Sequence, residues 1–202
     1  MAYLESAVVV YLRAIYYPSG FEFPLVAMPG PMVALEIGRE AATVVMLLAV
    51  AMLLGRDGWE RFFVFSIAFG VWDIFYYVFL WVFLRWPQSL LTWDVLFLIP
   101  VPWLGPVLAP VIVSLALITS SVWLWRLKLE GHPLMFSRRL WSLAILGGGL
   151  VLMSFMVDFQ SAVALTLPAP FRWDIFGAGM ALALGALLWG VPRRVDPRPQ
   201  PG

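Results

Sequence analysis

Cysteine is absent from this 202-residue chain, and histidine occurs once, at His132. Without cysteine, the chain can form no disulfide, iron–sulfur cluster, thiolate zinc site or cysteine nucleophile. A single histidine also excludes a bis-histidine haem within the chain and any multi-histidine metal centre. The sequence therefore predicts no metal site and no cofactor.

Charge is scarce as well, since only 12% of the residues are charged and the formal net charge is +1. Soluble domains carry about 25% charged residues. Hydrophobic residues make up 62% of the chain, which predicts an integral membrane protein surrounded by the lipid bilayer. A net charge so close to zero gives no indication of nucleic-acid binding.

Long apolar runs predict an all-α bundle of five transmembrane helices. A helix needs about 17 to 25 apolar residues to cross a bilayer, and runs of suitable length cover residues 32–54, 62–84, 106–125, 140–160 and 175–191. Prolines interrupt the stretch before the third run, and proline breaks a helix interior. We therefore expect a proline-kinked start to the third helix over residues 94–105, as a kinked helix, a short interfacial helix or a re-entrant segment. Residues 32–191 form one transmembrane domain in this prediction.

The N-terminal region, residues 1–31, holds an apolar stretch too short for a comfortable span. Residues 3–17 include Glu5 and Arg13 and stop before Pro18, so their length favours an interfacial helix followed by an external loop. If they span, the bundle has six helices. No basic segment or small-residue cleavage pattern precedes Pro18, so no signal peptide is predicted.

Basic residues alternate between the connections and predict an orientation. Cytoplasmic connections keep the excess of arginine and lysine. One side has Arg56, Arg61, Arg126, Lys128, Arg138, Arg139, Arg193, Arg194 and Arg198, and the other has only Arg13, Arg85 and Arg172. We expect a multi-pass protein of a bacterial inner (plasma) membrane, with a flexible, proline-rich cytoplasmic tail over residues 192–202.

Small residues in the last two predicted spans indicate close helix packing. Gly147, Gly148 and Gly149 are adjacent, and Gly177, Ala181 and Gly185 recur every four residues. Small residues on one helix face let two backbones approach each other inside a membrane. We expect these residues to form packing seams.

Polar residues inside the spans are the candidate site, because charges within a membrane are costly and usually functional. Glu36, Arg39 and Glu40 share one helix face by their spacing, and Asp73 lies mid-span, followed within one turn by two tyrosines. The predicted orientation places these groups in the outer half of the membrane, together with other aspartates at the outer ends of spans. The predicted ligand- or ion-binding residues are Glu36, Arg39, Glu40, Trp72, Asp73, Tyr76, Tyr77, Asp94 and Asp158.

A structural alternative competes with this site. Arg39 could pair with Glu36, Glu40 or Asp73 only to close the bundle, and Asp94 could be a favourable charge at a helix N-terminus. A closed network predicts paired, dry charges, whereas a binding site predicts a wet cavity.

Three functions fit this sequence. The first is binding or transport of a cation, a proton or a small cationic or polar molecule in an outward-facing acidic and aromatic pocket. The second is a non-catalytic accessory or assembly subunit, with a membrane-protein partner or a second copy of the chain. The third is an intramembrane enzyme acting on a lipid or isoprenoid, which is least favoured because no recognisable nucleophile or paired acidic motif is present.

Overall fold

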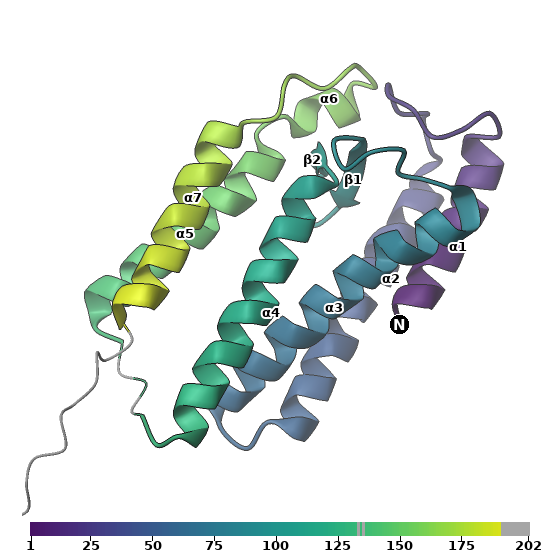
Figure 1. Ribbon diagram of the computed structural model, residues 1–202. Helices are drawn as coiled ribbons and strands as arrows, with labels where there is room; N and C mark the ends of the chain where they lie inside the picture. The colour runs from purple at the N-terminus through teal and green to yellow at the C-terminus, as the bar shows by residue number, and fades with distance from the viewer. Residues whose placement is uncertain (133, 135, 191–202) are drawn as a thin grey trace, which may run out of the picture.

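The computed structural model describes residues 1–132, 134 and 136–190. Within them the chain forms seven helices and two short strands (Figure 1). In chain order these are α1 (Ala2–Tyr16), α2 (Gly30–Leu54), α3 (Gly58–Leu84), β1 (Trp93–Phe97), β2 (Trp103–Pro106), α4 (Leu108–Leu129), α5 (Arg138–Met156), α6 (Phe159–Val163) and α7 (Trp173–Gly190). The predicted tail, with Arg193, Arg194 and Arg198, lies outside the described residues.

Five helical segments in this part of the chain are long and apolar enough to cross a membrane. They are Gly30–Leu54, Gly58–Leu84, Leu108–Leu129, Arg138–Val163 (which combines α5 and α6) and Trp173–Gly190. This confirms the prediction of a mostly helical, multi-pass membrane bundle. Local signals explain two of the starts: α2 has a proline in its first turn, and the Asp57 carboxylate caps α3 by accepting a hydrogen bond from the Glu60 N–H at 3.0 Å.

The segment before α4 is a β-hairpin within a mostly helical bundle, so the helical alternatives expected for residues 94–105, a kinked helix or a short interfacial helix, are wrong. β1 and β2 pair antiparallel, with Trp93 opposite Pro106 and Val95 opposite Leu104. Prolines exclude a helix here, and aromatic and branched residues favour the extended alternative. The pairing lets the two strands satisfy each other's backbone groups. Gly105 lets β2 lie close to two rings, because a Cβ there would lie 3.2 Å from Phe155 and Phe171.

α5 and α7 pack tightly through glycine, as expected for Gly147 on α5, but α7 uses a different row of small residues from the predicted one. A Cβ on Gly147 would lie 2.5 Å from the Ala183 backbone nitrogen, and one on Gly179 would lie 2.7 Å from the Gly147 carbonyl. Gly177 and Gly185 have no such neighbour within 4 Å. The seam therefore uses Gly147, Gly179 and Ala183, because helix rotation decides which row of small residues faces the partner.

The bundle has two distinct ends. The connections α2–α3 and α4–α5 lie at one end, while the β-hairpin, α6 and the α1–α2 loop lie at the other (Figure 1). We call these the basic end and the hairpin end, because six of the basic residues counted above flank the former: Arg56, Arg61, Arg126, Lys128, Arg138 and Arg139.

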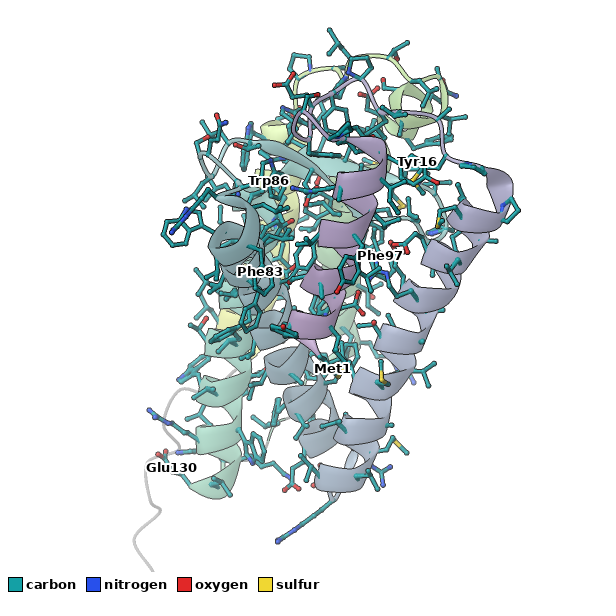
Figure 2. The ribbon with its side chains drawn as sticks, turned by 90° about the vertical axis from the view of Figure 1, so that its right-hand side faces the viewer. Met1, Tyr16, Phe83, Trp86, Phe97 and Glu130 are labelled. Atoms are coloured by element: carbon teal, nitrogen blue, oxygen red, sulfur yellow. The ribbon has the colours of Figure 1, made fainter. Side chains whose placement is uncertain are left out.

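α1 lies along the bundle instead of across its end. Figure 2 shows α1 between α2 and α3, with Met1 near mid-height and Tyr16 near the hairpin end. Its buried residues are Ala2, Glu5, Ser6 and Arg13, and the Ser6 hydroxyl donates to the Tyr76 carbonyl of α3 at 3.0 Å. Thus α1 inserts a polar face into the bundle, although at fifteen residues it is shorter than the five spanning segments.

Candidate binding cavity

A cavity of about 440 Å³ opens near the hairpin end, between α1, α2, α3 and the β-hairpin. Pockets that bind small molecules measure about 300–1,000 Å³. Eight of the nine residues predicted from sequence line it: Glu36, Arg39, Glu40, Trp72, Asp73, Tyr76, Tyr77 and Asp94. The cavity wall thus brings together residues from α2, α3 and β1, which are separate segments of the chain.

Arg39 of α2 joins two helices through its guanidinium group. Its Nη2 lies 2.8 Å from Glu36 Oε2, one turn earlier on the same helix. Its Nη1 pairs with Glu5 of α1, and the Thr43 hydroxyl donates to that same Glu5 carboxylate. Arg39 therefore takes one of its predicted partners, Glu36, and one that the sequence did not suggest.

Asp94 is 2% exposed and lies on β1, so its predicted place at a helix N-terminus is wrong. Arg13 Nη2 lies 3.3 Å from its Oδ1, and the Tyr77 hydroxyl donates to its Oδ2 at 3.3 Å. Burial raises the pKa of Asp94 to about 6, although the Arg13 charge opposes this rise. The Arg13 guanidinium carbon also lies 3.6 Å from the centre of the Trp86 ring and 4.3 Å from that of Phe21, so cation–π contacts help to hold it.

Glu40 and Asp73 have no arginine or lysine partner among the described residues. Glu40 is 7% exposed, and its Oε2 accepts a hydrogen bond from the backbone N–H of Leu98 at 2.8 Å. Asp73 Oδ2 accepts from the Ser114 hydroxyl of α4 at 2.8 Å. The second oxygen of each carboxylate receives no hydrogen bond from this part of the protein, so both groups keep free acceptor capacity toward the cavity.

The cavity wall carries five carboxylates against two guanidinium groups. Arg13 and Arg39 bind three of the acids, and Glu40 and Asp73 are left without a cation. The expected closed network therefore exists only in part. Over residues 1–132, 134 and 136–190, no three histidine or acidic side chains gather as a metal-binding group, so the carboxylates are spread around the wall.

Asp158 does not line this cavity. Its carboxylate accepts hydrogen bonds from the Ser161 hydroxyl at 2.8 Å and from the Ala169 N–H at 2.7 Å. These contacts hold the turn that begins at α6. Its geometry is that of a loop-stabilising residue.

Sequence reasoning missed Glu5 and Arg13, which line the cavity, and Thr43 and Ser114, which donate hydrogen bonds to the lining acids Glu5 and Asp73. Glu5 and Arg13 are eight residues apart, which places them on one face of a helix, and this spacing could have indicated that α1 presents a charged face to the bundle. No comparable signal marked Thr43 or Ser114, because hydroxyl side chains are common in membrane helices and bond to their own backbone.

These features define a multi-pass helical membrane protein with a charged cavity near one end of its bundle. Comparison with protein-family models, with curated proteins and with solved structures finds no match for this chain.

Proposed function

We propose that this protein binds a small organic cation in the cavity and moves it across the membrane or presents it to a partner. The observation that carries this proposal is the excess of carboxylates on the wall, with Glu40 and Asp73 lacking a cation. An ionised carboxylate away from water is costly unless a positive charge neutralises it. A bound cation would supply that charge.

The spacing of the acids supports an organic cation over a metal ion. A divalent ion needs several oxygen ligands converging within about 2.6 Å, and no such group exists in the described part of the chain. A molecule with an ammonium group could contact a carboxylate and still reach the aromatic walls. Trp72 and Tyr76, stacked with ring centres 6.5 Å apart, both line the cavity, and aromatic faces attract ammonium groups.

An accessory role is the second candidate, and the Arg39 contacts favour it. Glu5, Glu36 and Arg39 form a closed ion-pair group between α1 and α2, as expected of charges that only fix a bundle. In this case Glu40 and Asp73 would be protonated, and the protein would serve as a scaffold for another membrane protein.

Thermal unfolding of the purified protein distinguishes the two candidates. The probes are tetramethylammonium, choline, spermidine and sodium, tested at two pH values on the wild type, Glu40→Gln and Asp73→Asn. The matched control is Glu22→Gln, which makes the same change at an exposed residue outside this cavity. Because a ligand that binds the folded state raises its stability by mass action, we expect an organic cation to raise the Tm of the wild type and Glu22→Gln only.

The contrary result would be that no ligand raises the Tm of the wild type, and that Glu40→Gln and Asp73→Asn have a lower Tm than the wild type without ligand. Such a result would show that these acids are structural, and it would favour the accessory role.

The orientation is part of the proposal: the basic end faces the cytoplasm of a bacterial inner membrane, and the cavity opens on the outer side. The absence of native cysteine allows a direct test with single cysteines at the exposed residues Gln88 and Arg56, which lie at the hairpin end and the basic end. A membrane-impermeant maleimide added to intact cells should label Gln88→Cys and not Arg56→Cys. The reverse labelling would contradict the orientation.

A further inference from the structure

We infer that the cation is an alkylammonium amphiphile, with a positive head group at Glu40 and a single alkyl chain along an apolar roof. This inference rests on the proposed function and names its ligand class. Four structural observations support it: the division of the cavity wall, the position of Glu40, the exposed apolar rim and the sign of the cavity charge.

The cavity wall is divided into a charged floor and an apolar roof. All charged lining residues come from α1, α2, α3 and β1: Glu5, Arg13, Glu36, Arg39, Glu40, Asp73 and Asp94. Three segments of the hairpin end form the roof, namely residues 25–28, the end of β1 and the hairpin turn with residues 96–98 and 102, and residues 162, 163 and 165 around the end of α6. Every lining residue from these three segments is apolar. A ligand that fills both parts must itself have a polar end and an apolar end.

Glu40 lies where the floor meets the roof. Its Oε2 accepts the backbone N–H of Leu98, and Leu98 belongs to the apolar hairpin turn. The carboxylate is more than nine-tenths buried, has no cationic partner in the described chain and keeps one oxygen without a hydrogen bond. An ammonium group donating to that oxygen would have its alkyl chain beside Leu98.

The roof reaches the exposed surface of the hairpin end. Val26, Val163 and Leu165 line the cavity and are also 45%, 68% and 39% exposed. An alkyl chain could therefore extend from the cavity into the surrounding bilayer, where apolar groups are stable.

Charge and shape exclude two other ligand types. A polyamine would place several charges against the apolar roof, where an unpaired charge is costly. A phospholipid would bring a phosphate close to a wall with five carboxylates and two guanidinium groups. A single-chain alkylammonium ion carries a positive head and no anion, which matches the sign of the floor.

The test measures affinity against chain length. The protein is placed in nanodiscs of zwitterionic phosphatidylcholine, and ethyl-, butyl-, hexyl- and octylammonium are titrated with tryptophan fluorescence as the readout. The matched neutral alcohols are titrated in parallel, and empty nanodiscs correct for partition into lipid. Burying one methylene contributes about 0.8 kcal/mol, so we expect affinity to rise roughly fourfold per methylene until the roof is covered.

Variants test the two halves of the site separately. Glu40→Gln should lower the affinity for octylammonium at least tenfold and leave the affinity for octanol unchanged. Val163→Asn should flatten the chain-length dependence without changing ethylammonium binding. Leu188→Asn is its control, because Leu188 is 67% exposed on α7 and lies outside the cavity, so this variant should behave as the wild type.

Three results would overturn the inference. If affinity depends on Glu40 but not on chain length, the ligand is a cation without a chain, and the proposed function survives. If vesicles containing phosphatidylethanolamine compete as well as octylammonium does, the source is a lipid head group and the single-chain ligand is wrong. If no ammonium compound binds, while the variants fold and unfold normally, both this inference and the proposed function fail.

Discussion

The α5–α7 pair and the α1–α3 group hold their helices together in opposite ways. α5 and α7 meet backbone to backbone at Gly147 and Gly179, and within the described residues no side-chain hydrogen bond or ion pair joins them. α1, α2 and α3 instead meet through charged and hydroxyl side chains such as Glu5 and Arg39, and a cavity lies between them and the β-hairpin. The helix pair without polar side-chain contacts between its members is closely packed, whereas a cavity lies beside the helices that meet through polar side chains.

This difference shows that one pair of helices in this bundle, α5 and α7, holds together without charged contacts. Close packing of small residues is sufficient for α5 and α7, as is usual between membrane helices. Arg39 and Arg13 bind α1 to the rest of the bundle, but Glu40 and Asp73 join no charged partner in the described chain. Each of these acids accepts one hydrogen bond from another element, but no cation pairs with its charge. A buried carboxylate without a cation is expected where a charged ligand completes the structure.

Removing the Arg39 charge should have the largest effect on stability. Arg39→Met leaves Glu5 and Glu36 buried without their cation, and breaking a buried ion pair costs about 3–5 kcal/mol. Chemical unfolding of the purified protein measures the loss. The triple variant with Glu5→Gln and Glu36→Gln should recover part of it, and an equally unstable triple variant would show that lost packing, not lost charge, is the cause.

Adding a side chain at the glycine contact between α5 and α7 should have the next largest effect on stability. Gly147→Ala places a methyl group 2.5 Å from the Ala183 nitrogen, and overpacking of this kind costs about 1–3 kcal/mol. Gly148→Ala is the matched control, because a Cβ there meets nothing within 4 Å, and it should leave the Tm unchanged or slightly higher. Equal losses in both variants would contradict the seam described for α5 and α7.

Asp94 should make stability depend on pH. Because its pKa is raised from 3.8 to about 6, the folded state holds this proton more tightly than the unfolded state does. The resulting stabilisation is fully present below about pH 4 and is lost as the pH rises through 6, on the order of 1–3 kcal/mol. Tm measured from pH 4 to 8 should fall more steeply for the wild type than for Asp94→Asn. Parallel curves would show that Asp94 does not titrate in this range.

The ion pairs of the basic end should matter least. Lys128 contacts Asp57 and Glu60 close to the exposed start of α3, and ion pairs near water contribute little. Lys128→Met should leave the Tm within experimental error. A large fall in Tm would show that this cluster contributes as much to stability as the Arg39 group does.

Most of the helices and much of the cavity wall could be predicted from the sequence. The apolar runs set the lengths of α2 and α3, and charges interrupting those runs marked Glu36, Arg39, Glu40 and Asp73, which line one cavity in the structure. Helical spacing is a local property, so it places such residues on one face without knowledge of the fold.

The parts that could not be predicted depend on contacts between distant segments. Prolines indicated that no regular spanning helix covers residues 94–105, but they did not reveal that the segment forms paired strands. Two rows of small residues exist on α7, and only packing against α5 selects the row of Gly179. The position of α1 along the bundle could not be predicted either, because its partners Arg39 and Asp94 lie on other elements.

The position of α1 also sets an order of events during synthesis. Every partner of its polar face comes later in the chain: Glu5 needs Arg39 and Thr43, Ser6 needs Tyr76, and Arg13 needs Asp94. A charged face without partners is unstable in lipid, so α1 cannot settle until α2, α3 and β1 have been made and inserted. α1 precedes α2, α3 and β1 in the chain, yet it is the last of these four elements to reach its final place.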